Sequence, residues 1–166
     1  MIFITVGTHD QGFERLISAM DKLAGKRKIK ERVVMQIGSS KYIPKNAEWF
    51  RYIGYKRMEE LNKKAKIIVT HGGAGSILTA LSLDKPTIAV PRLKKMGEAI
   101  NNHQLDLVKK LEKKGKIIAV YDIKNLNNTI LKVKTLKKTK KGNRTTKNMI
   151  CDEIRIYLNK WYKKSK

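Results

Sequence analysis

The sequence has only one cysteine and three histidines among its 166 residues. A single thiol, Cys151, cannot form an internal disulfide, which excludes a disulfide-stabilised scaffold and fits a reducing cytosol. The longest apolar stretches, such as Ile117 to Tyr121, are far shorter than the roughly 20 residues that cross a bilayer. Met1 to Val6 includes neither a basic region nor a cleavage site, so we expect no signal peptide.

Acidic residues are also scarce: 14 Asp and Glu stand against 38 Lys and Arg, giving a net charge of +24. No acid lies between Asp122 and Asp152, an interval that holds nine lysines and arginines. Such charge favours an anionic partner, such as a phosphorylated substrate, an anionic membrane surface or nucleic acid, or it is simply a solvated basic face. Nucleic acid is not expected, because we find neither aromatic stacking platforms nor a recognised binding motif.

Short apolar runs alternate with amphipathic segments along most of the chain. The runs predict strands at 1–6, 33–37, 50–53, 67–70, 87–90 and 117–120, and the amphipathic segments predict helices at 13–23, 56–64, 77–83 and 105–111. Continuously apolar strands alternating with helices are typical of a parallel sheet covered on both faces. The sequence therefore predicts an α/β, Rossmann-like, doubly wound domain.

The domain is expected to span residues 1–122. Residues 123–166 are expected to form a basic segment and a C-terminal helix that packs on the domain or on a partner. Within them, 132–147 is interpreted as a mobile linker or an exposed helix. The apolar stripe of the last helix consists of Ile150, Ile154, Tyr157, Leu158 and Trp161.

Polar segments, three of which contain glycine, follow four of the predicted strands. They are Gly7-Thr8-His9, Gly38-Ser39-Ser40, His71 to Ser76, and Pro91-Arg92. The carboxyl ends of parallel strands meet at one edge of a sheet, where ligands of such domains bind. We therefore expect these segments to line one shared cleft.

The segment Thr70 to Ser76 carries the strongest chemical signal. A strand leads into it and a helix leaves it, while its glycines let the backbone approach a ligand and expose N–H groups. The positive end of the helix dipole suits a diphosphate. The segment is neither the dinucleotide-binding fingerprint nor a P-loop, and a tight turn without a ligand is the alternative. Asn101 to Gln104, at the start of a later helix, offers polar side chains that could bind a sugar or a ribose, or form an ordinary helix N-terminus.

Taken in order, these segments resemble the C-terminal half of the family 28 glycosyltransferases. The resemblance rests on Thr70 to Ser76, Lys85-Pro86, Val90 to Arg92, Asn101 to Gln104 with Leu105 and Leu111, and the opening Phe3 to Asp10. It extends to about Val120 and is greatest to the small stand-alone members, the Alg13-like and PssE-like subunits. It implies the C-terminal half of a GT-B glycosyltransferase.

The resemblance further implies a donor-binding subunit of a two-component glycosyltransferase, active only with its partner. The donor would be a UDP-sugar, and a sugar such as N-acetylglucosamine or glucuronic acid would pass to a lipid-linked acceptor. A membrane-anchored acceptor-binding subunit of the Alg14 or PssD type would place the chain in the cytoplasm, peripheral at the inner face of the membrane. A basic nucleic-acid-binding module and a nucleotide-sugar sensor are the alternatives.

Carried over by position, the resemblance assigns the glycine loop to the donor diphosphate, the start of the later helix to the sugar, and the turn after the second strand to the opposite wall. The expected substrate-binding residues are Thr8, Gly38, Ser39, His71, Gly72, Gly73, Ala74, Gly75, Ser76, Thr79, Arg92, Asn102, His103 and Gln104. Thr79 stands where the family often has a ribose-binding glutamate, and its shorter, uncharged side chain weakens the contact that the resemblance implies.

His9 is the one strand-end histidine outside the expected donor loops, so it is the candidate catalytic base. The alternatives are that His9 orders its own loop and that the partner supplies the base. His9, His71 and His103 are not at metal-ligand spacing, so we expect neither a metal site nor a cofactor.

Overall fold

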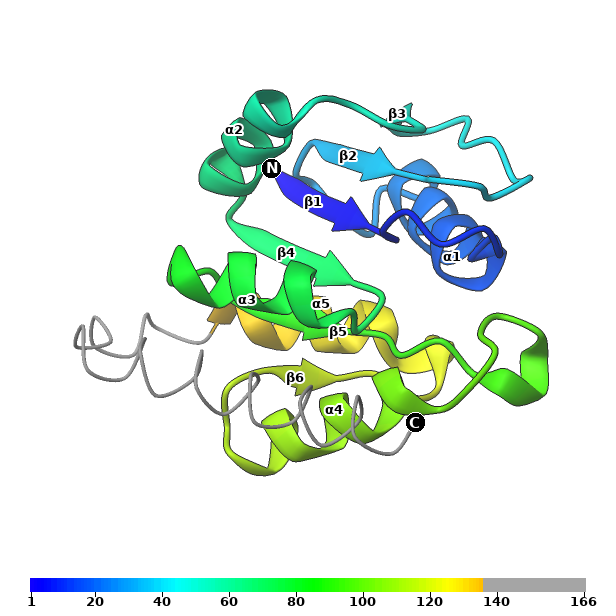
Figure 1. Ribbon diagram of the computed structural model, residues 1–166. Helices are drawn as coiled ribbons and strands as arrows, with labels where there is room; N and C mark the ends of the chain where they lie inside the picture. Colours follow the sequence, from blue (N-terminus) through cyan, green and yellow to red (C-terminus); the bar gives the residue numbers. More distant parts are fainter. Residues whose placement is uncertain (136–166) are drawn as a thin grey trace.

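The computed structural model describes residues 1–135, which contain a six-stranded parallel sheet in the order β3-β2-β1-β4-β5-β6 (Figure 1). The strands are β1 (Ile2–Thr5), β2 (Val33–Gln36), β3 (Glu48–Phe50), β4 (Ile67–Thr70), β5 (Thr87–Ala89) and β6 (Ile118–Ala119). Every neighbouring pair in this sheet runs parallel. The strand order confirms the predicted doubly wound fold.

Helices cover both faces of the sheet (Figure 1). They are α1 (Glu14–Gly25), α2 (Tyr55–Lys64), α3 (Ala74–Ser82), α4 (His103–Lys113) and α5 (Leu126–Thr135), with the 3-10 turns η1 (Lys94–Met96) and η2 (Ile123–Asn125). Alternate strand residues point to opposite faces. Ile2 and Ile4 accordingly lie in a core cluster with residues of α1 and α5, whereas Phe3 lies in a cluster with residues of α2 and α3.

The third strand lies earlier than predicted. A strand was expected at 50–53, but β3 covers Glu48–Phe50. Its ladder with β2 runs from Val34 opposite Glu48 to Gln36 opposite Phe50. Two further backbone bonds, from Ile37 N to Phe50 O at 2.9 Å and from Gly38 N to Arg51 O at 3.3 Å, extend the contact as far as Arg51. Gly38, with φ of +53°, then turns the chain, so the ladder does not continue over 51–53. Register with β2, which is a nonlocal property, sets the position of this edge strand.

The helix α5 lies within the segment that sequence analysis placed after the domain. Its Leu126, Ile130 and Val133 are buried in the same core cluster as residues of α1. The chain from 126 to 135 therefore packs on the sheet in spite of its lysines. The rest of the basic segment, and the predicted helix at 150–161, lie outside the described residues.

Candidate functional site

The sheet has a topological switch point between β1 and β4, where the strand order reverses. Ligands of doubly wound domains bind beside the carboxyl ends of the strands at such a point. Gly7 follows β1 and His71 follows β4, and a Cβ on Gly7 would lie 2.7 Å from the imidazole ring. Because Gly7 also has φ of +74°, only glycine fits there without strain.

The loop between β4 and α3 lies under the start of α4. Gly72 has φ of +86°, and a Cβ there would lie 2.9 Å from a methyl group of Val108 and 3.6 Å from the Cβ of Gln104. The glycine therefore lets α4 pack directly over the loop. This contact brings the predicted glycine loop and the predicted polar helix start together.

The N-terminus of α3 has the geometry of an anion site. Its N-cap is Gly73, which offers no side chain, and the first helical bond runs from Ile77 N to Gly73 O at 3.0 Å. The N–H groups of Ala74, Gly75 and Ser76 thus have no acceptor within the helix, and they lie at the positive end of its dipole. A Cβ on Gly75 would meet nothing within 4 Å, so the space beside the Cα of Gly75 is open.

The side chain of His71 is buried against Gly7 and Gly73 rather than exposed at the site. It is 8% exposed, and a Cβ on Gly73 would collide with its ring, as one on Gly7 would. Burial, and secondly the charge of Arg92, lower the pKa of His71 to about 4, so the ring is neutral at pH 7. The Nδ1 atom lies 3.3 Å from Thr5 O and can donate only if it carries the proton, which leaves Nε2 as an acceptor.

The turn after β2 lies against the turn after β1. A Cβ on Gly38 would lie 2.8 Å from the carbonyl oxygen of Gly7. The Ser39 hydroxyl is 2.8 Å from the Tyr52 hydroxyl, and Tyr52 is about half exposed. Tyr52 was not among the expected site residues, because it follows an edge strand and belongs to none of the motifs recognised in the sequence. An aromatic residue near a polar turn was the only available signal.

Gln36 fixes the backbone after β1 and was also missed. Its Oε1 accepts hydrogen bonds from Thr5 Oγ1 at 2.8 Å, Val6 N at 3.1 Å and Gly7 N at 3.0 Å. Its Nε2 donates to Gly7 O at 2.8 Å. A buried amide with both ends paired holds the switch-point turn in one conformation.

The start of α4 presents the polar residues expected at the sugar. Asn102 is the N-cap and makes no side-chain capping bond, while Asn101 Oδ1 accepts from His103 N at 3.1 Å. Gln104 Oε1 is buried and has no hydrogen-bond partner among residues 1–135. A buried, unpaired acceptor is unfavourable in isolation. A ligand hydroxyl or a water at this position would satisfy it.

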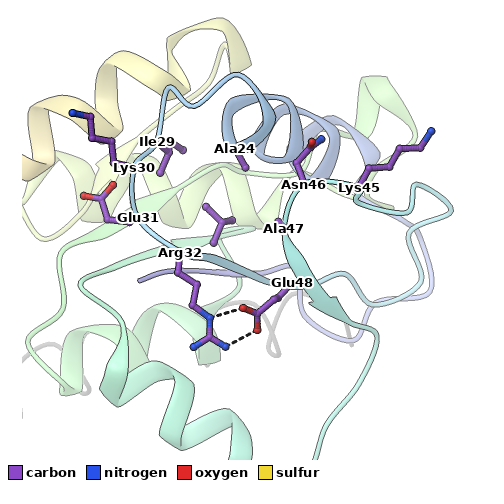
Figure 2. A pocket seen from close by; sticks show the side chains of 10 residues that line it. Ala24, Ile29, Lys30, Glu31, Arg32, Lys45, Asn46, Ala47 and Glu48 are labelled. Carbon is purple, nitrogen blue, oxygen red and sulfur yellow. Dashed lines mark hydrogen bonds and ion pairs between the residues drawn. The ribbon is translucent and has the colours of Figure 1, made fainter.

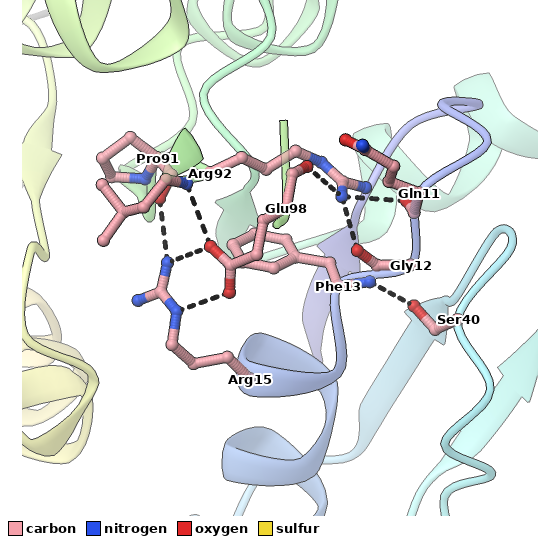
Figure 3. A network of polar contacts seen from close by, with 9 residues as sticks. Gln11, Gly12, Phe13, Arg15, Ser40, Pro91, Arg92 and Glu98 are labelled. Carbon is pink, nitrogen blue, oxygen red and sulfur yellow. Dashed lines mark hydrogen bonds and ion pairs between the residues drawn. The ribbon is translucent and has the colours of Figure 1, made fainter. Parts of the chain in front are cut away.

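Arg92 is buried among the loops at the carboxyl edge rather than exposed at the surface. Its side chain is 1% exposed. Its guanidinium donates to the backbone carbonyls of Gln11, Gly12 and Glu98 (Figure 3), and also to that of Val6. A ligand contact was expected for Arg92 from its strand-end position and from the resemblance. The position of Arg92 in the sequence predicted the edge of the sheet at which it lies but did not predict the direction of its side chain.

Thr8, His9 and Thr79 lie at the periphery of this group. Thr8 is exposed in the loop after β1. His9 Nδ1 accepts from Gln11 N at 3.1 Å, a bond that puts the proton of the neutral ring on Nε2. Thr79 Oγ1 donates to Gly75 O at 2.9 Å, one turn back in α3. The Thr79 hydroxyl proton is therefore used within its own helix.

A hollow of about 530 Å³ lies at the other edge of the sheet (Figure 2). It is lined by the end of α1 and by residues at the amino ends of β2 and β3, including Lys30, Arg32 and Glu48. None of the expected site residues lines it. Within residues 1–135, no group of three or more His, Cys, Asp or Glu side chains could hold a metal ion.

Comparisons with known proteins agree on one family. The family model "Glycosyltransferase family 28 C-terminal domain" matches residues 1–154. The relative "UDP-N-acetylglucosamine transferase subunit ALG13" of Homo sapiens is 35% identical over 123 residues, and that of Mus musculus is 33% identical over 122. These alignments cover 69% and 68% of this chain and 10% of each relative. The chain thus spans about a tenth of the length of these relatives.

Solved structures share the fold. The calicheamicin glycosyltransferase CalG4 has a TM-score of 0.63 and 17% identity, covering 95% of this chain and 42% of that one. The glycotransferase of kitacinnamycin has a TM-score of 0.62 and 15% identity, covering 95% and 39%. UDP-GlcNAc 2-epimerase of Methanocaldococcus jannaschii has a TM-score of 0.56 and 16% identity, covering 93% and 45%. The glycosyltransferase neighbours confirm the predicted GT-B half.

Proposed function

The chain belongs to the glycosyltransferase family 28 C-terminal domain family, and from this premise we propose that it is the donor-binding subunit of a two-component glycosyltransferase. The donor is a UDP-sugar. The names of the relatives, UDP-N-acetylglucosamine transferase subunits, support N-acetylglucosamine as the sugar, with glucuronic acid as the alternative. The open, glycine-led N-terminus of α3 at the switch point is the observation that carries the proposal.

In this proposal the diphosphate binds the N–H groups of Ala74, Gly75 and Ser76, and Gly75 leaves room for it. Gln104 Oε1 accepts a hydrogen bond from a sugar hydroxyl, which would satisfy its buried acceptor. Asn102 and His103 lie at the same helix start. The sugar thus lies between α3 and α4.

The nucleoside half of the donor is proposed to bind towards β2. The half-exposed ring of Tyr52, held by the Ser39 hydroxyl, offers an aromatic surface to the base. Thr79, whose hydroxyl donates to its own helix, supplies at most an acceptor to the ribose. Binding in this half therefore depends on ring contact more than on charge.

A second subunit completes the proposed enzyme. The loops at the carboxyl edge supply a donor site, and transfer requires an acceptor held beside it. We propose a membrane-anchored, acceptor-binding subunit of the Alg14 or PssD type, with a lipid-linked acceptor. The Gln11 N–His9 Nδ1 bond supports a loop-ordering role for His9 and favours a catalytic base from the partner.

Within residues 1–135, no helix has the length and apolar character needed to cross a membrane. We propose peripheral attachment at the inner face of the membrane, through the partner and through basic residues against anionic lipid. The net charge of +24 supports this attachment, since each basic residue near such a surface contributes about 1 kcal/mol.

The diphosphate site is tested by replacing Gly75 with valine and measuring UDP binding by calorimetry. The branched side chain fills the space before the free N–H groups, so the affinity for UDP should fall by at least about tenfold, or 1.4 kcal/mol. Ser82→Val, at the opposite end of α3, is the control and should bind as the wild type does. Equal binding by the Gly75→Val variant and the wild type would place the diphosphate elsewhere. Titration with UDP-N-acetylglucosamine and UDP-glucuronic acid then identifies the preferred sugar.

A further inference from the structure

Two loops at the carboxyl edge carry expected site residues but are not neighbours in the sheet. The loop after β1 carries Thr8 and His9, and the loop after β5 leads to Asn102 and Gln104. Strand β4 separates β1 from β5, so no strand ladder joins the two loops directly. The position of one loop relative to the other therefore depends on contacts outside the strand ladders.

Arg92, at the start of the loop after β5, reaches across to the loop after β1. Its Nη1 donates to Gln11 O at 2.9 Å and to Gly12 O at 2.7 Å, and its Nη2 donates to Val6 O at 3.0 Å. The guanidinium carbon lies 4.7 Å from the centre of the Phe13 ring. Because the side chain is buried, water does not compete for these bonds. Arg92 thus links the two loops.

Glu98 and Arg15 form a second link beside the first (Figure 3). Arg15 Nε and Nη2 each lie 2.8 Å from one Glu98 carboxylate oxygen, and Nη2 also donates to Pro91 O at 3.0 Å. Glu98 Oε2 additionally accepts from Leu93 N at 3.0 Å, which closes the loop on itself. The start of α1 is thereby bonded to both ends of the segment from Pro91 to Glu98.

Stability alone does not explain these charges. Replacing a buried ion pair with apolar residues of similar volume is often neutral or stabilising, because desolvation offsets the attraction. What an apolar cluster lacks is directional bonding to particular carbonyl groups. Arg92 and Arg15 bond to five backbone carbonyls, and these bonds set loop geometry instead; the carbonyls are those of Val6, Gln11, Gly12, Pro91 and Glu98.

We propose that Arg15, Arg92 and Glu98 are positioning residues that hold the start of α4 at a fixed distance from the loop after β1 before any ligand binds. This inference rests on the proposed function, since it assigns the sugar to the start of α4. The network preorganises the sugar subsite, whereas the diphosphate subsite at α3 is fixed by glycines and His71. Breaking the network should therefore weaken binding of the sugar and leave binding of the diphosphate nearly unchanged.

The test is the Arg15→Met variant, which retains the apolar stem and removes the guanidinium. Arg15 lies at the rim of the network, at 13% exposure, so its loss endangers folding less than the loss of Arg92. Affinity for UDP, measured by calorimetry, should stay within about twofold of wild type, while affinity for UDP-N-acetylglucosamine falls about tenfold. Amide hydrogen exchange across 93–102 should accelerate about tenfold. Arg15→Lys, which keeps the positive charge but cannot form the two parallel bonds to Glu98, should give intermediate values.

Arg32→Met is the matched control, because Arg32 forms a similar pair with Glu48 at the other edge and should change neither readout. Unchanged binding and exchange in the Arg15→Met variant would overturn the proposal, as would an equal loss of affinity for both ligands. If Arg15→Met does not fold, Arg15→Lys decides by the same criteria. If the wild type binds neither ligand, the proposed function fails separately, and exchange across 93–102 alone decides whether the network fixes the loop.

Discussion

Two arginine–glutamate pairs of similar geometry lie at opposite edges of the sheet. At the carboxyl edge, Arg15 Nε and Nη2 are each 2.8 Å from the Glu98 carboxylate, and the side chains are 13% and 10% exposed (Figure 3). At the amino edge, Arg32 Nε and Nη2 are each 2.5 Å from the Glu48 carboxylate, and the side chains are 59% and 57% exposed (Figure 2). Burial, and not pair geometry, distinguishes them.

The difference shows what each pair can determine. Arg32 immediately precedes β2 and Glu48 begins β3, two strands that the backbone ladder already joins, and water can replace each partner. Arg15 and Glu98 join segments that no ladder connects, and Glu98 also holds Leu93 N. The same chemistry therefore adds little to the structure at one edge and sets the path of a loop at the other.

The largest effect is expected from Glu98→Gln. In either orientation the introduced amide turns a donor towards an N–H of Arg15 or of Leu93, leaving a buried donor unpaired. Breaking one side of a buried pair typically lowers the free energy of unfolding by about 3 kcal/mol. Urea unfolding followed by circular dichroism measures it. A loss no greater than that caused by a surface substitution would remove the distinction between the two pairs.

Acid should affect the carboxyl edge before the amino edge. The folded pKa of His71 is about 4 against 6.5 for the free side chain, so the unfolded state binds more protons between these values. The stabilisation that comes from keeping His71 neutral is complete above pH 6.5 and is lost as pH falls towards 4. At pH 5 the loss in free energy of unfolding is about 2 kcal/mol. Hydrogen bonding by Arg32 lowers the pKa of Glu48, so this carboxylate is protonated only at a lower pH than an ordinary glutamate.

The measurement is urea unfolding at pH 7.5 and pH 5 for the wild type and for His71→Asn. Subtracting the two pH dependences removes the contributions of groups common to both proteins. We expect the wild type to lose about 2 kcal/mol more than the variant over this interval. Parallel behaviour of the two proteins would mean that the ring is protonated as easily in the folded state as in the unfolded one.

Local patterns were enough to predict the fold and the position of the glycine loop within it. The run from Thr70 to Ser76 joins a strand and a helix that are each recognisable from their own periodicity, and the structure places it at the switch point. The Arg92 network was not predictable in this way, because its partners lie as many as 86 residues apart. Arginine in a loop is ordinarily exposed.

The helix α5 and the edge strand β3 show the same limit. Leu126, Ile130 and Val133 have helical spacing, but they lie in the segment 123–166 that was expected to follow the domain, and only Val133 falls within 132–147, the stretch interpreted as a linker or an exposed helix. Only their contact with the α1 face of the sheet decides their burial. Strand β3 takes its position from its register with β2, which is not a property of its own residues. Packing and register are nonlocal, whereas turn chemistry is local.

The smallest effect is expected from Glu48→Gln, the same substitution in the exposed pair. The amide keeps one acceptor for Arg32, water solvates the remaining donors, and both side chains regain freedom that the pair restricts. The β2–β3 ladder is unaffected, so the urea midpoint should stay within experimental error of the wild type. Raising the salt concentration should reduce any residual difference, since exposed charges are screened. A loss equal to that of Glu98→Gln would mean that pair geometry determines the contribution, and the loop-positioning role of the buried pair would then need a cause other than burial.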